Sequence, residues 1–314
     1  MDDGRFHRER RAAILRQHPA VKELFGPCPR TAFLAACVVA GQFTIAGALA
    51  QQPWWVAVIA AIGVGAFAQH YLNVVIHEGS HNLIVRGTPM NKAVAIMANL
   101  PGLVPSAIGF RYYHLLHHRF LGYRGLDADV PMPWEVRLIG RSVLGKLVWV
   151  LAQPFTYSLM HPLQVTRRIP FDGWLLANIA VVLAADAAVV YGFGWMALLY
   201  LALSTYFAVG PHPTGAHILQ EHLIFEGSGY ETASYYGPVN AISINHGYHL
   251  EHHDFPNVPG PRLSELTRLA PEQYQGRFRH RSRLLTLWRF ITDRRIAIDS
   301  RAIRSEPAPA DVQA

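Results

Sequence analysis

The chain has 314 residues, of which 51% are hydrophobic and only 16% are charged, and its formal net charge is +7. Together with a positive mean hydropathy, this composition argues against a soluble protein and is typical of an integral membrane protein. Lys and Arg commonly flank membrane spans and attract anionic headgroups. The basic charge therefore indicates a lipid bilayer as a partner, and we expect no nucleic-acid partner.

Thirty mostly polar and charged residues precede the first apolar run. A cleavable signal peptide would place its apolar stretch earlier, so we expect 1–30 to be a cytoplasmic N-terminal segment. The polar, proline-containing residues 305–314 predict a disordered tail. The residues between these ends, 31–304, are expected to form one membrane domain.

Four apolar runs approach the ~20 residues that a bilayer-spanning helix needs, and they lie at 31–50, 54–76, 174–192 and 194–209. Very short turns join the first to the second and the third to the fourth, which predicts four transmembrane helices in two hairpins. All 28 Lys and Arg fall outside these hairpins, within 5–30, 86–168 and 262–304. Because basic segments stay cytoplasmic, we expect both termini and the central segment on the cytoplasmic side.

Two weaker apolar stretches, 93–109 and 144–163, are interrupted by prolines. We interpret them as interfacial or re-entrant helices, although a single additional span there would separate parts of the site described next. Asp186, within the third run, is either a functional group or merely a neighbour of another helix. The 25 Arg against 3 Lys suggest a GC-rich bacterial genome, so we expect the bacterial inner membrane, or the endoplasmic reticulum membrane if the source is eukaryotic.

Histidines recur at helical spacing in three clusters, all in segments expected to be cytoplasmic: His77 and His81; His114, His117 and His118; His249, His252 and His253. Residues three and four apart share one face of a helix, so each cluster is expected to aim its imidazoles at a common point. A tetrahedral zinc takes at most four ligands, and imidazole also suits iron and copper. Eight convergent nitrogens therefore predict a two-metal, histidine-only centre.

Two other functions compete for these histidines. The residues from His77 to His81 match HExxH, the zinc-protease helix whose Glu is the general base, but a protease would leave the two HxxHH clusters unused. A metal transporter would place its polar ligands within the spans, whereas the clustered histidines lie at or beyond the ends of the apolar runs.

The sequence around the clusters resembles the sphingolipid Δ4-desaturase (dihydroceramide desaturase) family of membrane fatty acid desaturases. Beyond the boxes, the resemblance rests on the Glu221-His222 pair and on residues 9–15, 119–122, 126–131, 235–240, 247–256 and 270–272. The resemblance implies an all-α membrane protein whose cytoplasmic helical cap carries a histidine-box di-iron site. It also implies one further histidine ligand, for which His222 is favoured and His217 is the alternative.

The resemblance further implies the reaction: dioxygen and two external electrons introduce a trans double bond between carbons 4 and 5 of the sphingoid base of dihydroceramide. The electron donor is expected to be of the cytochrome b5 or ferredoxin type, with its NAD(P)H reductase. A sphingolipid C4-hydroxylase or a fatty acyl desaturase of the same superfamily remains open.

Six polar residues near the boxes are candidates either for head-group recognition or for support of the metal ligands: Asn82, Arg119, Asp127, Asp129, Tyr236 and Asn245. Asn245 lies four residues before His249, so a shared helical face is expected. A plain helix cap is the alternative for this residue.

Overall fold

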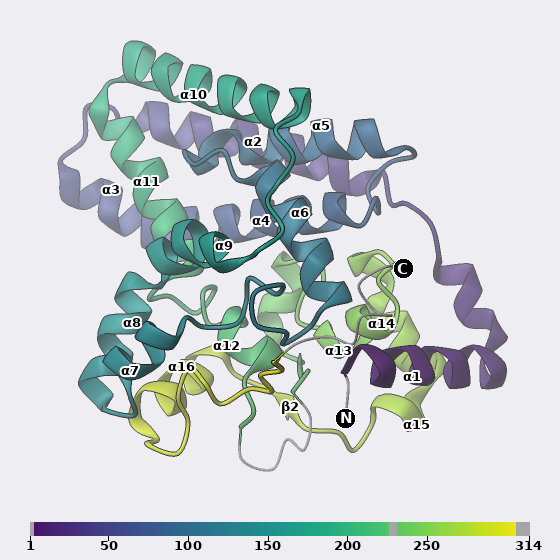
Figure 1. Cartoon of the computed structure of the whole chain (residues 1–314). Helices are drawn as coiled ribbons and strands as arrows, with labels where there is room; N and C mark the ends of the chain where they lie inside the picture. Colours follow the sequence, from purple (N-terminus) through teal and green to yellow (C-terminus); the bar gives the residue numbers. More distant parts are fainter. Residues whose placement is uncertain (1–2, 226–230, 306–314) are drawn as a thin grey trace.

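The structure is a computed structural model that describes residues 3–225 and 231–305. The chain folds almost entirely into helices, and its one sheet within these residues pairs two short parallel strands, β1 (Ser234–Tyr235) and β2 (Arg279–His280). Figure 1 shows the long apolar helices in the upper part of the molecule and the shorter helices of a cap below them. Residues 306–314, most of the predicted disordered tail, lie outside the described residues.

The apolar part contains seven α-helices, a π-helical turn and a short 3₁₀ helix. In chain order they are α2 (Arg30–Ala48), α3 (Trp54–Ala60), the π turn η2 (Ala61–Gly65), α4 (Ala66–Ser80), α5 (Thr88–Asn99) with the short η3 (Leu100–Gly102), α6 (Ala107–Arg119), α10 (Gly173–Phe193) and α11 (Trp195–Val209). Leucine, valine, alanine and isoleucine dominate these segments, because a helix surrounded by other helices or by lipid needs an apolar surface on all sides.

Three of these helices are long and apolar enough to cross a membrane: α2, the continuous helix Trp54–Ser80 and α10. The predicted span 194–209 is shorter than required, because α11 has 15 residues and such a helix is only about 22 Å long. Four spans in two hairpins therefore remain a prediction. The stretch 93–109 lies on α5, η3 and the start of α6, which bend by 116° at their break, as a re-entrant segment would.

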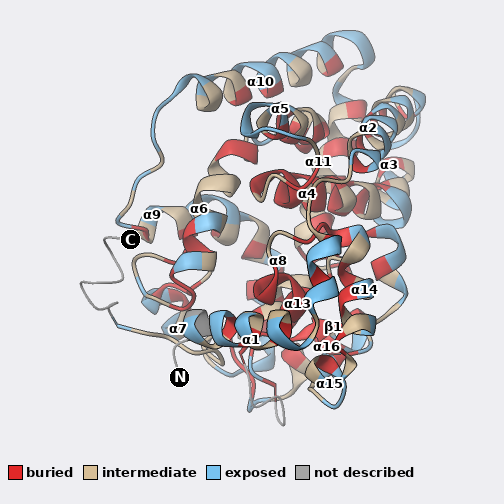
Figure 2. Ribbon diagram, turned by 90° about the vertical axis from the view of Figure 1, so that its right-hand side faces the viewer, coloured by how far each residue is buried: buried red, intermediate tan, exposed pale blue. Residues whose placement is uncertain are grey.

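Helix α4 is the centre of the apolar part, and it packs against α2, α5, α6 and α11. Figure 2 shows α4 buried over most of its length, whereas α10 has exposed and intermediate residues on much of its surface. The approach of α11 to the start of α4 depends on Gly65, where a Cβ atom would lie 2.0 Å from Ser204 Oγ. This burial fixes the direction of α4 and so the position of the histidines at its end.

The cap combines the N-terminal segment with the two stretches that follow α6 and α11. Its elements are α1 (Asp3–Gln17), η1 (Pro19–Leu24), α7 (Pro133–Ile139), α8 (Val143–Phe155), the π turn η4 (Thr156–Met160), α9 (His161–Gln164), α12 (His217–His222), η5 (Pro238–Ile242), α13 (His249–Asp254), α14 (Gly260–Leu269), α15 (Pro271–Tyr274) and α16 (Arg283–Thr292). One apolar core joins α1, η1, α13, α14 and α15, and another joins α7, α8, α12 and α16. The weak apolar stretch 144–163 thus forms α8, η4 and α9.

Candidate metal centre

The structure brings all nine sequence-predicted metal histidines together at the boundary between the apolar helices and the cap. They come from four elements: the end of α4, α6, α12 and α13. Their ring nitrogens form two groups within each of which the ligand atoms lie within 4.8 Å of one another. The first group is His77, His81, His114, His118 and His252, and the second group is His117, His222, His249 and His253.

The two HxxHH boxes each contribute to both groups, so the expectation that one box aims at one point is wrong. Adjacent residues on a helix differ by about 100° in direction, whereas residues four apart differ by only about 40°. His114 and His118 consequently share the first group, while His117 points to the second. Each of the two HxxHH boxes therefore supplies ligand atoms to both groups. Helices α6 and α13 thereby fix the position of one group relative to the other.

The nitrogen separations fit coordination of a metal ion. In the first group His81 Nε2 lies 2.8 Å from His114 Nε2, and His118 Nε2 lies 3.1 Å from the same atom. In the second group His222 Nε2 lies 3.1 Å from His117 Nε2 and 2.9 Å from His249 Nε2. Two imidazoles bound at right angles with bonds of about 2.1 Å, the length found for zinc, would have nitrogens about 3 Å apart.

The chemistry of the donor set also fits a metal better than a purely hydrogen-bonded cluster. A neutral imidazole has one N–H donor and one acceptor nitrogen. Each ring turns one nitrogen toward its group, and five such nitrogens cannot all be paired with one another. Among the described residues, buried nitrogens without a hydrogen-bond partner include both of His77 and Nε2 of His253. Such atoms are costly unless another partner binds them.

Burial holds these imidazoles in the neutral, metal-binding form. Desolvation, reinforced by the neighbouring imidazoles, lowers the pKa well below its ordinary value for seven of the nine: His81, His114, His118, His222, His249, His252 and His253. Neutral imidazole is the ligand that transition metals bind. The protonation state of these seven imidazoles therefore suits metal binding.

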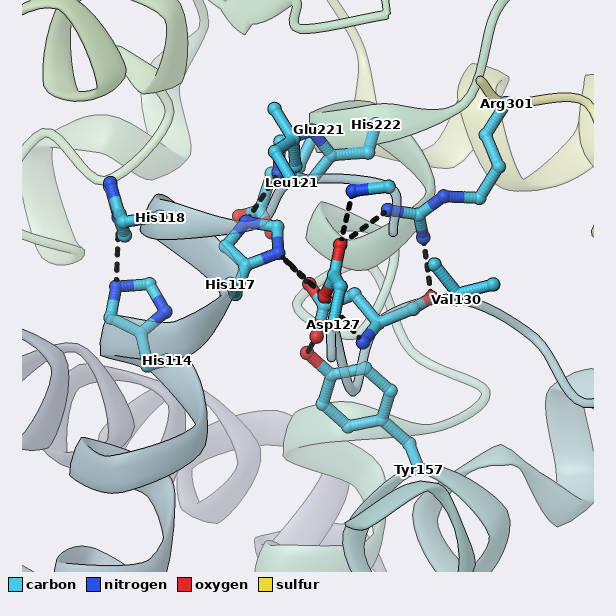
Figure 3. Close-up of polar contacts among 12 residues, drawn as sticks. His114, His117, His118, Leu121, Asp127, Val130, Tyr157, Glu221, His222 and Arg301 are labelled. Atoms are coloured by element: carbon cyan, nitrogen blue, oxygen red, sulfur yellow. Dashed lines mark hydrogen bonds and ion pairs between the residues drawn. The ribbon is translucent and has the colours of Figure 1, made fainter. Parts of the chain in front are cut away.

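His117 differs because a carboxylate faces Nδ1, the ring nitrogen that does not point toward the second group. Its Nδ1 donates a hydrogen bond of 3.0 Å to Asp127 Oδ1, which turns Nε2 toward the second group (Figure 3). Burial alone would lower the pKa of His117, but Asp127 and Asp129 raise it to about 9. A carboxylate at the outer nitrogen of a metal-bound histidine fixes its orientation and increases its basicity.

Asp127 is itself held in place. It is fully buried, accepts hydrogen bonds from the backbone N–H of Gly122 and Asp129, and lies 3.9 Å from the guanidinium of Arg301. Tyr157 donates to Asp129 Oδ1 across 2.7 Å (Figure 3). Sequence reasoning identified both aspartates by their proximity to the box but missed Tyr157 and Arg301, which arrive from distant segments without a sequence signal.

Asn82 has a backbone role. Its φ of 59° is left-handed, its N–H donates to Gly79 O, and the next N–H, that of Leu83, donates to Glu78 O. This is a Schellman ending, for which Asn is one of the few suitable residues. Arg111 of α6 completes it by donating to the carbonyls of Gly79 and Ser80, so α4 ends at Ser80, with His81 as its C-cap residue.

Asn245 does not share a helical face with His249, so that expectation is wrong. Helix α13 begins only at His249, and Asn245 lies in a preceding turn with a φ of 57°. The Asn245 side chain donates to Pro261 O at 3.4 Å. It therefore belongs to the turn that precedes the third box.

Tyr236 and Arg119 make contacts within the cap. The Tyr236 hydroxyl donates to Glu251, a residue of α13, and burial together with that carboxylate raises the pKa of Tyr236 well above its ordinary value. The Arg119 guanidinium lies over the ring of Phe120, 5.1 Å from its centroid. Tyr236 thus contacts α13, the helix of the third box, through Glu251 and not through a histidine.

His217, the alternative ninth ligand, belongs to neither of the two groups. Its Nδ1 donates to Thr214 O at 2.7 Å, and its ring lies beside His70 and His246. Together with Glu221 and His246 it forms a separate polar group, in which His246 Nε2 lies 3.0 Å from Glu221 Oε1. His222, five residues further on, is the histidine that joins the second group.

Glu78, the acid of the HExxH match, bonds to the cap, while its Oε1 lies 3.8 Å from His77 Nδ1. Its Oε2 accepts a hydrogen bond of 2.9 Å from the backbone N–H of Gly260 in α14, and its side chain is 3% exposed. A protease general base has to reach a metal-bound water. The observed contact instead links the first box to the cap.

Comparisons with known proteins identify the family of this chain. The fatty acid desaturase family model matches residues 53–284, and the sphingolipid Δ4-desaturase model matches residues 3–30. A rice protein named sphingolipid delta(4)-desaturase DES1-like is 41% identical over 96% of this chain and 90% of its own length. A Drosophila melanogaster sphingolipid delta(4)-desaturase DES1 is 39% identical over 91% of this chain and 89% of its own length. The human sphingolipid delta(4)-desaturase/C4-monooxygenase DES2 is also 39% identical, over 91% of this chain and 88% of its own length. The chain therefore belongs to the fatty acid desaturase family and, within it, to the sphingolipid Δ4-desaturases.

Proposed function

We propose that this protein is an oxidoreductase that introduces a trans double bond between carbons 4 and 5 of the sphingoid base of dihydroceramide. The proposal is supported by relatives named sphingolipid delta(4)-desaturase over nearly the full chain. The single structural observation that carries it is the convergence of nine histidines in two groups. Saturated methylene carbons offer no acidic proton and no leaving group, so side-chain catalysis alone cannot modify them.

We assign the nine histidines as ligands of two iron ions: His77, His81, His114, His118 and His252 for one, and His117, His222, His249 and His253 for the other. Two irons bound there would supply, with dioxygen and two electrons, the oxidising power to remove hydrogen from an unactivated methylene pair. Asp127 orients His117, and Arg111 fixes the end of α4. Positioning of this kind is what a protein contributes to such chemistry.

The electrons have to come from a separate protein. A donor of the cytochrome b5 or ferredoxin type, with its NAD(P)H reductase, fits a cytoplasmic cap, and basic surfaces favour acidic carriers. We place the cap and both termini in the cytoplasm, with four spans in the bilayer, because all Lys and Arg lie outside the two apolar hairpins. The inner membrane of a bacterium is the proposed location.

Lipid analysis tests the substrate and the outcome. Cells that lack the activity, express this chain and receive labelled dihydroceramide should accumulate a product lighter by two hydrogens, with a trans double bond at carbons 4 and 5. Mass spectrometry of the extracted lipids would detect it, and cells that express His118→Ala are the matched control. Labelled dihydroceramide that emerges unchanged while ordinary acyl chains become unsaturated would contradict the sphingolipid assignment.

Hydroxylation at carbon 4 is the second candidate outcome, because the human relative is named a desaturase and a C4-monooxygenase. Both reactions begin with removal of hydrogen from the same region of the chain. They differ in whether a second hydrogen leaves or oxygen is added to carbon. A product heavier by one oxygen atom in the same lipid extract would identify this outcome.

The Glu78→Gln variant tests the protease alternative. Gln retains an oxygen that can accept the Gly260 N–H, so we expect desaturation to fall less than about 10-fold, the lower limit for losing a partner outside the ligands. If Glu78 were the general base of a protease, the same change would instead lower peptide cleavage about 100-fold or more. Turnover of labelled dihydroceramide by the purified variant is the measurement, and release of peptides by the wild-type protein would support the protease.

A further inference from the structure

Helix α13 carries three of the nine clustered histidines but has only six residues. An isolated helix of this length is not stable in water, so contacts with other elements have to fix its position. His249, His252 and His253 face the two groups, and two carboxylates, Glu251 and Asp254, are buried three residues apart. These two side chains are the polar attachments of α13 to the rest of the cap.

Glu251 is attached within the C-terminal part of the chain. Its carboxylate accepts hydrogen bonds from Ser234 Oγ of β1 at 2.5 Å, from the Tyr236 hydroxyl, and from Thr267 Oγ1 of α14 at 3.2 Å. All three partners lie within 20 residues of Glu251 along the chain. This attachment needs no contribution from the N-terminal segment.

Asp254 is attached mainly by α1, almost 250 residues earlier in the chain. His7 Nδ1 donates to Asp254 Oδ1 at 2.7 Å, and Arg10 donates to Oδ2 from Nε at 3.0 Å and from Nη2 at 2.9 Å. Tyr274 of α15 donates to the same oxygen at 3.0 Å. The Asp254 side chain is 0% exposed, and that of Arg10 is 8% exposed. Removal of one partner from such a pair leaves a buried charge without compensation, which is strongly unfavourable.

The attachment point is next to the second group. Asp254 directly follows His253, and the His7 ring packs against the His253 ring with centroids 5.2 Å apart. His7 Nε2 also lies 3.3 Å from Thr232 Oγ1. A shift of α13 at this end would therefore move two of the four histidines of the second group, His253 and His249, and one of the five histidines of the first group, His252.

We infer that α1 is a positioning element for the second metal site, in which Arg10 and His7 hold Asp254 and thereby fix His253 and His249. The inference rests on the proposed two-iron centre. It also gives a role to the N-terminal segment, because the sphingolipid Δ4-desaturase model matches 3–30 whereas the general desaturase match begins at residue 53. The N-terminal helix is then a part of the site that this branch adds to the general desaturase fold.

Cobalt binding tests the inference without reference to lipid turnover. Full-length protein in detergent, freed of metal with a chelator, is titrated with Co²⁺, whose visible absorption reports imidazole coordination. The wild type should bind about two Co²⁺ per chain, as two separate groups require. The binding step that His222→Ala alters belongs to the second group.

Arg10→Ala should weaken that step by about 10-fold, the lower limit for losing a direct partner of a metal ligand, because Arg10 acts through Asp254. It should weaken the other step less, because α13 supplies two of the four histidines of the second group but only one of the five in the first. Arg8→Ala is the matched control, because Arg8 lies exposed on the same helix and carries the same charge. Arg10→Lys keeps the charge and should restore part of the lost affinity.

The possible results distinguish the role of α1 from the two-iron proposal on which it rests. Equal binding by Arg10→Ala and Arg8→Ala would overturn the role of α1 while leaving the two-iron proposal intact. Equal weakening of both steps would show that Arg10 serves the folding of the cap as a whole, and would also overturn the inference. A wild type that binds fewer than two Co²⁺ would contradict the two-iron centre itself, and the inference with it.

Discussion

Replacement of His252 by Ala is expected to abolish desaturation. His252 Nε2 lies 3.2 Å from His118 Nε2 in the first group, and its side chain is almost fully buried, so neither water nor a neighbouring side chain can take its place without rearrangement. We expect activity to fall by more than about 100-fold, beyond the range for partners outside the ligands. Bound iron should fall from about two ions per chain toward one.

The matched control for this variant is His18→Ala. His18 pairs with Glu272 near the surface, at 2.5 Å, and belongs to neither histidine group. Its loss should leave the iron content and the turnover of dihydroceramide nearly unchanged, because exposed ion pairs contribute little to stability. Full iron content and full activity in His252→Ala would contradict the assignment of this histidine as a ligand.

The sequence predicted which histidines would come together because their signal is local. Spacings of three and four residues are properties of one helix, so the boxes at 77–81, 114–118 and 249–253 could be identified without a fold. The division of each box between two groups could not be predicted in this way. It depends on how α4, α6, α12 and α13 pack around the two sites, which only the tertiary structure shows.

Contacts between distant segments had no sequence signal. Arg10 and Asp254 are 244 residues apart, and Tyr157 reaches Asp129 from a π turn that follows Pro154. The roles of Asn82 and Asn245 were missed for a different reason. Both have a left-handed backbone conformation, and an asparagine in a sequence gives no indication of whether its side chain or its backbone matters.

Hydropathy predicted where the apolar helices lie in the sequence, but not their lengths or the angles between them. Hydropathy identified the segments of α2, α4, α10 and α11, yet the length of α11 depends on where the chain turns into the cap at Gly210. The proline-interrupted stretch at 93–109 became a sharply bent pair of helices. Prolines predict such breaks but not their angle.

His222→Ala and His217→Ala should differ strongly in turnover and in bound iron, although the two variants are otherwise similar. The two histidines begin and end the same short helix, α12, so their replacement removes the same side chain from the same element. His222 Nε2 lies within 3.1 Å of His117 Nε2 and of His249 Nε2, whereas His217 Nδ1 is bonded to Thr214 O. Loss of His222 should therefore leave the second group with three nitrogens.

We expect His222→Ala to have no detectable turnover of labelled dihydroceramide and to lose one of about two irons per chain. His217→Ala removes one hydrogen bond, worth about 1 kcal/mol, and should keep both irons and measurable turnover. Iron analysis of the purified variants, together with mass spectrometry of the product, checks both statements. The reverse order would make His217 the ninth ligand. It would also require α12 to rotate when metal binds, since a separation of five positions places the two histidines about 140° apart around the helix.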